Sequence, residues 1–94
     1  MNQEFEWDEQ KSKINLNKHG ISFDFAELLF FEDYLCQYDD RFNYGEDRFQ
    51  AIGEVYGIVL FVTYTVVNQE KIRLISARKA TKKERKIWEE YYYE

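Results

Sequence analysis

The spacing of apolar and polar residues predicts two helices near the N-terminus. Asp8 is a suitable N-cap for a helix over Glu9–Lys18, because a short acceptor side chain binds the free amide groups of a first turn. Gly20 is suited to end that helix in a left-handed conformation. Ser22 is the N-cap of a second helix, which ends at about Phe31. The apolar face of this second helix consists of Phe23, Ala26 and Phe30.

The middle of the chain predicts four strands, because β-branched and aromatic segments there are separated by polar turns. The strands are Tyr34–Tyr38, Asp47–Gly53, Ile58–Val67 and Lys71–Ser76. The turns are expected at Asp39-Asp40, Glu54-Val55-Tyr56 and Val67–Glu70. In the last strand, alternation places Arg73 and Ile75 on the face opposite Ile72 and Leu74. Consecutive strands joined in this way favour an antiparallel sheet in meander order.

The C-terminal segment predicts a third helix. Thr81 and Glu84 have the spacing of a capping box, in which each side chain binds a free amide group of the other residue. Larger side chains then recur at helical spacing: Ile87, Trp88, Tyr91 and Tyr92. The order of elements predicts an α+β fold, with two N-terminal helices, a four-stranded antiparallel sheet in meander order and a C-terminal helix.

The composition fits a single domain that spans residues 1–94. The chain has 94 residues, of which 45% are hydrophobic and 19% aromatic, enough for one core and too few for two. The longest apolar run, Ile58–Val67, is far shorter than the roughly 20 residues that cross a membrane. The acidic segment Met1–Gln10 does not fit a signal peptide, and Cys36 has no second cysteine for an internal disulfide. A cytoplasmic protein without membrane association is expected.

Charge is distributed unevenly along the chain, whose formal net charge is −5. Residues 21–54 contain nine acids and two arginines, a net charge of −7, whereas residues 71–86 contain eight bases and one glutamate, a net charge of +7. The first segment repels a polyanion and the second attracts it. Charged helix faces are often only solvated, so the basic segment indicates either a solvated surface or an anion-binding one.

Three blocks of residues resemble the BrnT family and cover nearly the whole chain in the family's order. The first block is Trp7-Asp8 with Lys11, Asn15 and Lys18-His19-Gly20-Ile21-Ser22-Phe23. The second is Gly45-Glu46-x-Arg48 with Ile52-Gly53, and the third is Ile75-Ser76-Ala77-Arg78-x-Ala80-Thr81-x-x-Glu84-Arg85. The resemblance implies a toxin of a type II toxin–antitoxin module with a fold similar to RelE-type ribonucleases. It also implies RNA as the substrate and a DNA-binding BrnA antitoxin as the partner, so that DNA is bound only through the complex.

The sequence contains neither a dedicated metal site nor a cofactor motif. One histidine and one cysteine provide no ligand set at metal spacing, and the acidic residues around Asp39 and Glu46 are typical of solvated turns. No glycine-rich phosphate loop is present. RNA cleavage requires neither a metal nor a cofactor, because the 2′-hydroxyl of the substrate can attack the adjacent phosphate. The protein then has to move protons and stabilise the charge that develops on the phosphate.

Arg48 and Arg78 are the first candidates for catalysis, because a guanidinium group binds two phosphate oxygens through parallel hydrogen bonds. Both arginines lie in blocks shared with the BrnT family. Each also has a structural alternative: Arg48 pairs with Glu46 or Asp47, and Arg78 covers the end of a helix.

Lys18 and His19 are further candidates for the catalytic site. Histidine is the residue type best suited to act as a general acid or base, which makes His19 a candidate for that role, and Lys18 is a candidate phosphate ligand or acid. A histidine in the last turn of a helix also interacts favourably with the helix dipole, so a purely structural role is the alternative.

Five residues are expected to bind RNA outside the reaction itself. Trp7 is suited to stack on an unpaired base, with burial in the core as the alternative. Four bases are expected to hold the RNA backbone: Arg73, Lys79, Lys82 and Lys83. The exposed aromatic residues near the C-terminus suit either a dimer within a toxin–antitoxin complex or contact with the antitoxin.

Two functions therefore fit the sequence. The first is a metal-independent endoribonuclease toxin that is neutralised by a BrnA-like antitoxin. The second is a non-catalytic interaction protein of the same fold, which binds an antitoxin-like partner and acts as a co-repressor on DNA. A third function, nucleic-acid binding without cleavage, predicts intact RNA and steep salt dependence.

Overall fold

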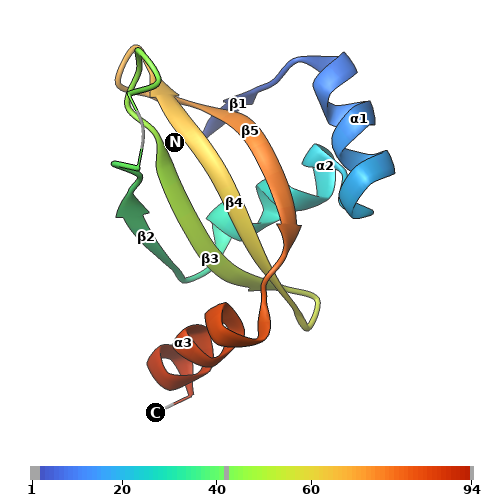
Figure 1. Cartoon of the computed structure of the whole chain (residues 1–94), viewed down its shortest axis with the longest axis vertical. Helices are drawn as coiled ribbons and strands as arrows, with labels where there is room; N and C mark the ends of the chain where they lie inside the picture. Colours follow the sequence, from blue (N-terminus) through green and yellow to red (C-terminus); the bar gives the residue numbers. More distant parts are fainter. Residues whose placement is uncertain (1–2, 42, 94) are drawn as a thin grey trace.

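A mixed sheet of five strands forms the centre of the protein (Figure 1). The strands are β1 (Glu4–Glu6), β2 (Tyr34–Tyr38), β3 (Phe49–Val55), β4 (Ile58–Val67) and β5 (Lys71–Lys79), and they pair in the order β1-β5-β4-β3-β2. The helical segments are α1 (Glu9–His19), α2 (Phe23–Ala26), the 3₁₀ segment η1 (Glu27–Phe31) and α3 (Lys82–Tyr92). This computed structural model describes residues 3–41 and 43–93. No helix within those residues is long and apolar enough to cross a membrane.

The α+β class and the antiparallel order of β2 to β5 confirm the prediction, but the sheet has a fifth strand that makes it mixed. β1 pairs with β5 in parallel, with Glu4 opposite Lys71 and Glu6 opposite Arg73. An ion pair of 2.7 Å between Glu6 Oε2 and Arg73 Nε joins the two strands. The prediction of a purely antiparallel, four-stranded sheet is therefore wrong. A short acidic segment has no strand signal of its own, and β1 exists because the edge of β5 offers hydrogen bonds and opposite charge.

Two strands differ from the prediction at their ends. β3 was expected over Asp47–Gly53 but begins at Phe49. It continues to Val55, because the turn lies at Tyr56-Gly57. The φ angles of 48° and 81° at these residues belong to the hairpin turn that matches the twist of antiparallel strands. β5 continues three residues beyond its predicted end. The bounds of β2 and β4 are as predicted.

The second predicted helix is not one continuous α-helix. A single α-helical turn, α2, tightens into the 3₁₀ segment η1. Ser22 caps it as predicted, because its Oγ accepts a hydrogen bond of 3.1 Å from the Phe25 amide. The fully buried Leu29 of η1 lies so close to β3 that a Cβ at Gly53 would stand 2.9 Å from Leu29 Cγ. This contact depends on a glycine from a distant strand, which helical periodicity cannot reveal.

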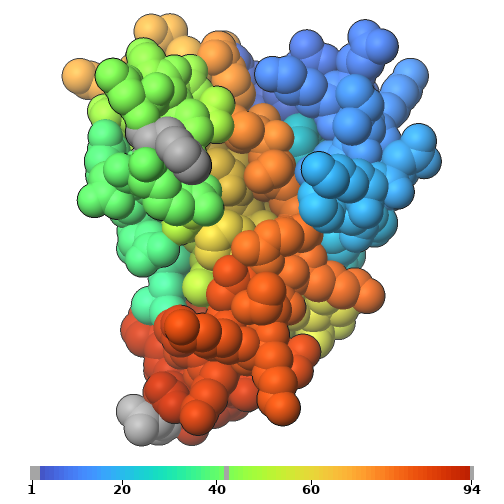
Figure 2. Space-filling view, in the orientation of Figure 1, coloured from blue at the N-terminus to red at the C-terminus, as the bar shows by residue number. Residues whose placement is uncertain are grey.

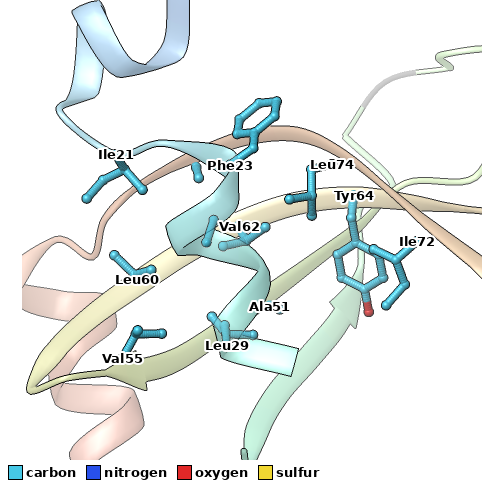
Figure 3. Close-up of a cluster of buried hydrophobic side chains, with 12 residues drawn as sticks. Ile21, Phe23, Leu29, Ala51, Val55, Leu60, Val62, Tyr64, Ile72 and Leu74 are labelled. Atoms are coloured by element: carbon cyan, nitrogen blue, oxygen red, sulfur yellow. The ribbon is translucent and has the colours of Figure 1, made fainter. Parts of the chain in front are cut away.

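The core lies between one face of the sheet and the segment formed by α2 and η1 (Figure 3). Phe23 and Leu29 contribute from the helical side, and Leu60, Val62 and Tyr64 contribute from the central strand β4. The whole buried cluster consists of Ile21, Phe23, Ala26, Leu29, Ala51, Val55, Leu60, Val62, Tyr64, Ile72, Leu74 and Ala77. Since side chains alternate along strands, the residues that alternate with these core residues face the opposite side, which we call the open face.

A β-bulge in β5 reverses which residues point to the open face. The register with β4 skips Ile75, which has no partner there. One extra residue exchanges the two faces for every residue that follows it. Leu74 and Ala77 therefore both point into the core, and Arg78 points to the same open face as Arg73. Simple alternation fails to predict this arrangement.

α1 closes the free edge of β5 through the side chain of Asn15, which is 6% exposed. The Asn15 amide nitrogen donates hydrogen bonds to the carbonyl groups of Ile21 and Ala77, both at 2.8 Å. Its carbonyl oxygen accepts a hydrogen bond of 3.1 Å from the Ala77 amide. β1 pairs with the other half of β5, so Asn15 supplies the hydrogen bonds that a further strand would supply here.

α3 lies across one end of the open face. Its predicted capping box is present between Thr81 and Glu84. Trp88 is 1% exposed, and its indole nitrogen donates a hydrogen bond of 3.1 Å to Glu54 Oε1 on β3. Trp88 therefore anchors the helix to the sheet, as do the hydrogen bonds from Arg78 on β5 to Glu84, and the helix leaves the rest of the open face uncovered.

We expect Asn15→Leu to lower the free energy of unfolding by at least about 2 kcal/mol, because it leaves one amide and two carbonyl groups of the backbone without partners. Urea denaturation followed by circular dichroism measures this change. Asn17→Leu, at an exposed position of the same helix, is the control and should change stability little. Equal stability of the two variants would contradict the edge-closing role of Asn15.

Candidate functional site

The open face forms a hollow with different elements on its sides. In Figure 2, β4 (yellow) lies at the bottom of this hollow. The segment after β2 (green), the helix α1 (blue) and the start of α3 (orange to red) surround it. A concave surface between elements of one domain is the usual place of a binding site.

Two rows of side chains cross the open face. The strand register aligns the first row as Gln37, Gln50, Thr63 and Ser76, and the second row as Leu35, Ile52, Phe61 and Arg78. The rows are two residues apart along each strand, or about 6.8 Å. A cavity of about 300 Å³ lies over them and is lined by Leu35, Cys36, Gln37, Arg41, Gln50, Ile52, Phe61, Arg78, Glu84 and Ile87.

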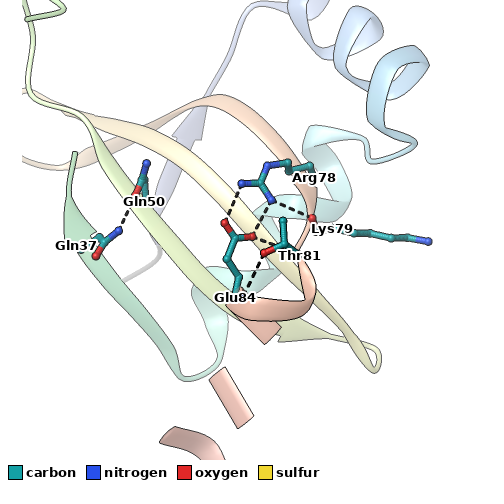
Figure 4. Close-up of polar contacts among 6 residues, drawn as sticks. All are labelled: Gln37, Gln50, Arg78, Lys79, Thr81 and Glu84. Carbon is teal, nitrogen blue, oxygen red and sulfur yellow. Dashed lines mark hydrogen bonds and ion pairs between the residues drawn. The ribbon is translucent and has the colours of Figure 1, made fainter. Parts of the chain in front are cut away.

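Arg78 and Glu84 form a two-point ion pair beside this cavity (Figure 4). Arg78 Nη1 lies 2.8 Å from Glu84 Oε1, and Arg78 Nη2 lies 3.0 Å from Glu84 Oε2. Hydrogen bonding to Arg78 is the main reason that the pKa of the Glu84 carboxyl lies below its usual value. Glu84 is therefore a carboxylate at neutral pH.

Contacts on both sides hold the Arg78–Glu84 pair in place. The guanidinium carbon of Arg78 lies 4.2 Å from the centre of the Phe61 ring, within the range of a cation–π interaction. Glu84 Oε1 also accepts a hydrogen bond of 2.9 Å from the Thr81 amide, which is the second half of the capping box. The bulge before Arg78 and the N-terminus of α3 thus orient the two partners. Arg78 therefore does contact the N-terminal end of a helix, as the structural alternative in the sequence analysis suggested.

A second arginine, Arg41, reaches the same cavity and was missed in the sequence. Its Nε and Nη2 donate to the two carboxylate oxygens of Asp39, at 2.8 and 3.0 Å. This pairing is the main reason that the pKa of Asp39 falls to about 2. The Asp39 residue is 3% exposed, whereas 60% of the Arg41 side chain is exposed. The sequence around Asp39 had indicated only a solvated acidic turn. The spacing Asp39-x-Arg41 was the feature that could have indicated this ion pair.

Arg48 lies in the loop before β3 and does not line the cavity. Its Nε is 3.7 Å from Glu46 Oε2, and its guanidinium carbon is 3.9 Å from the centre of the Tyr44 ring. The Nε atom is buried and has no hydrogen-bond partner among the described residues. The pairing with Glu46 that the sequence allowed is therefore present as a long ion pair.

Three other predicted site residues, Lys18, His19 and Trp7, are not part of the cavity lining. Lys18 and His19 form the last turn of α1, one of the elements around the hollow in Figure 2. Trp7 packs against the core with its ring 6.1 Å from that of Phe23, and its indole nitrogen donates to Glu9 Oε1 at 2.8 Å. Trp7 therefore packs against the core, which was the alternative to base stacking in the sequence analysis.

The four bases expected to hold RNA have different surroundings. Arg73 is paired with Glu6 at the β1–β5 edge. Lys79 is exposed and its side chain points away from the Arg78–Glu84 pair (Figure 4). Lys82 and Lys83 are exposed in the first turn of α3. The structure therefore brings together Arg78, Glu84 and Arg41, of which the sequence singled out only Arg78 for catalysis.

The pair can bind an anion and accept a proton. Arg78 keeps its Nε hydrogen and one Nη2 hydrogen outside the hydrogen bonds to Glu84 and to the Lys79 carbonyl, so a phosphate has donors available. The ionised Glu84 carboxylate beside it can accept a proton from a hydroxyl group. Among residues 3–41 and 43–93, no group of three or more His, Cys, Asp and Glu side chains is arranged to hold a metal ion.

We expect Glu84→Gln to remove the ion pair with Arg78 but to keep the capping box, because glutamine retains the capping hydrogen bonds. At pH 7 the variant should be less stable than the native protein by about 1 kcal/mol. Since the pKa of Glu84 is lowered in the folded state, this difference is present above the ordinary glutamate pKa. It should shrink as the pH falls through the folded-state pKa and Glu84 becomes protonated.

Urea denaturation at pH 7, 5, 4 and 3 measures this difference, and the titration of Asp39 is common to both proteins and cancels. Glu90→Gln, at an exposed position of α3, is the control for removal of a charge. A difference that stays constant over this pH range would contradict a stabilising Arg78–Glu84 pair.

The comparisons with known proteins agree with the resemblance of the three sequence blocks. The family model described as ribonuclease toxin, BrnT, of type II toxin-antitoxin system matches residues 7–84, which include Arg78 and Glu84. The 1.1 Å crystal structure of the Brucella abortus ribonuclease toxin BrnT is 31% identical, with a TM-score of 0.65. That match covers 86% of this chain and 100% of the other. No curated protein sequence matches the chain. The protein belongs to the BrnT family of ribonuclease toxins of type II toxin–antitoxin systems.

Proposed function

We propose that this protein is a metal-independent endoribonuclease, the toxin of a type II module, and that a BrnA-like antitoxin neutralises it. The observation that carries the proposal is the Arg78–Glu84 ion pair, which lines a cavity on the uncovered face of the sheet. An anion-binding guanidinium beside an ionised carboxylate matches the needs of RNA cleavage by an internal nucleophile. Membership of a ribonuclease toxin family supports the same activity.

In the proposed reaction, Glu84 removes the proton of a 2′-hydroxyl, and the resulting oxygen attacks the adjacent phosphorus. Arg78 stabilises the negative charge that develops on the phosphate oxygens. The bond to the 5′-oxygen breaks and that oxygen takes up a proton, which leaves a 2′,3′-cyclic phosphate and a 5′-hydroxyl end. The chemistry needs no metal because the nucleophile belongs to the substrate.

Other candidate residues act from the surroundings of the cavity. Lys18 and His19 are proposed to give the proton to the 5′-oxygen, since α1 borders the same hollow (Figure 2). Arg48 is proposed to bind phosphate through the exposed part of its guanidinium group, since 28% of its side chain is exposed and its ion pair with Glu46 is long. The four bases proposed to hold the RNA backbone are Arg73, Lys79, Lys82 and Lys83, and Trp7 is proposed to stack on a base beside α1.

The proposed antitoxin contact has a specific candidate surface. A cavity of about 350 Å³ near the end of α3 is lined by acidic and aromatic side chains, among them Glu32, Asp33, Glu54, Trp88, Tyr92 and Tyr93. Carboxylates beside aromatic rings suit the lysine and arginine side chains of a basic protein segment. This surface also favours the second candidate function, in which the protein has no catalytic activity, binds an antitoxin-like partner and acts as a co-repressor.

Incubation of the purified, partner-free protein with total RNA in excess EDTA tests the proposed activity. We expect native protein to produce fragments, and Arg78→Ala to reduce the rate at least about 100-fold, because a preorganised donor to the developing charge is lost. The Arg48→Ala/Arg78→Ala double variant should reduce it further. Arg85→Ala removes an exposed charge from α3 outside the cavity and should cleave at nearly the native rate.

Near-UV circular dichroism of each variant separates a loss of activity from a loss of fold. Equal rates for native protein and the folded Arg78→Ala variant would contradict the proposed role of Arg78. Intact RNA with every protein would favour the co-repressor function or cleavage that depends on the ribosome.

A further inference from the structure

Gln37 and Gln50 form a pair on the open face that the proposed chemistry does not use. The two residues lie opposite each other on β2 and β3, and Gln37 Nε2 donates a hydrogen bond of 2.7 Å to Gln50 Oε1 (Figure 4). Gln50 is 6% exposed although it carries a polar side chain, whereas Gln37 is exposed at the edge strand. The hydrogen bond fixes the orientation of both amide groups.

The pair presents one donor and one acceptor to the cavity. Gln50 Nε2 and Gln37 Oε1 have no hydrogen-bond partner among the described residues, and both side chains line the cavity of about 300 Å³. Within the described residues, Arg48 Nε is the buried side-chain atom without a partner, so Gln50 Nε2 is accessible from the cavity, where a ligand can complete its hydrogen bonds. That ligand must offer an acceptor to Gln50 Nε2 and a donor to Gln37 Oε1.

The surroundings of the pair narrow the chemistry of the ligand. Leu35, Ile52 and Phe61 give the cavity apolar walls, which suit a flat, weakly polar ring. Arg78 lies in the next row, about 6.8 Å further along the strands, and Arg41 lines the same cavity. A ligand that combines a planar hydrogen-bonding edge with a negative charge about one row away is a nucleotide.

We infer that the Gln37–Gln50 pair reads a nucleobase of the RNA whose phosphate is bound by Arg78. The inference rests on the proposed function, since it concerns the substrate of the same site. Glutamine side chains recognise bases through paired donor and acceptor contacts, and single-stranded RNA exposes the base edges for such contacts. Cleavage by this protein is therefore base-selective, and the two glutamines determine the selectivity.

Binding of RNA that cannot be cleaved tests this inference separately from catalysis. The probes are four fluorescein-labelled 2′-O-methyl pentanucleotides, each with one base, A, C, G or U, between abasic positions. The single base removes any ambiguity of register, and the 2′-O-methyl group removes the nucleophile. Fluorescence anisotropy gives the dissociation constant of each probe.

We expect native protein to bind its preferred probe at least about fivefold more tightly than the least favoured one. In Gln37→Glu, the Gln50 amide nitrogen turns to the new carboxylate, so the pair presents two acceptors and the order of the four probes changes. Gln10→Glu adds the same charge at an exposed position of α1 and should keep the native order. Arg78→Ala should weaken all four probes by a similar factor and also keep the order.

Gln50→Met removes the buried amide and should bring the four dissociation constants to within about twofold of one another. Gln37 is exposed on the edge strand, so its variant tests the inference even where Gln50→Met does not fold. Equal native affinities for the four probes, or an unchanged order in folded Gln37→Glu, would overturn base reading. The matching 2′-hydroxyl probes report cleavage, so selective binding without cleavage would reject the proposed function alone.

Discussion

The β-bulge at Ile75 decides which side chains of β5 face the core and which face the hollow. Before the bulge, Leu74 packs against the helices, and after it Ala77 does the same, although the two residues are three positions apart. The extra residue places Arg78 beside Phe61 and within reach of Glu84. Without it, a long cation would point into an apolar core, where an unpaired charge is strongly unfavourable. Fold and site thus depend on one irregularity of the sheet.

One face of the sheet stabilises the fold, and the other holds the candidate site. α2 and η1 cover one face with fully buried side chains such as Leu29, and this apolar burial provides the main stabilisation. α3 attaches to one end of the other face, through Trp88 and through the ion pair of Glu84 with Arg78. The polar side chains of the open face are therefore held by a rigid sheet without being covered. A site on strands backed by a packed core keeps its geometry better than a site on loops.

Charge is organised by contacts that the chain order does not show. The acidic segment 21–54 and the basic segment 71–86 each contain an internal ion pair, Arg41 with Asp39 in the first and Arg78 with Glu84 in the second. Both arginines line the cavity, so guanidinium groups are available to a ligand of the open face in a protein of net charge −5. The net charge is therefore a poor guide to the ligand of the open face, because a site responds to the charges nearest to it.

The sequence by itself determined the α+β class, the caps of the helices, the antiparallel order of β2 to β5 and the family, because these depend on local spacing and on residues near one another in the chain. Tertiary structure alone decided that β1 is a strand, that η1 is a 3₁₀ helix, which residues of β5 face the core after the bulge, and where the cavity lies. Each of these depends on a partner from a distant segment, such as Gly53 for Leu29 or Gln50 for Gln37. Arg78 was identifiable from a motif, whereas its partner Glu84 was recognised only as a cap, because a local pattern shows what one segment can do and not which segment it meets.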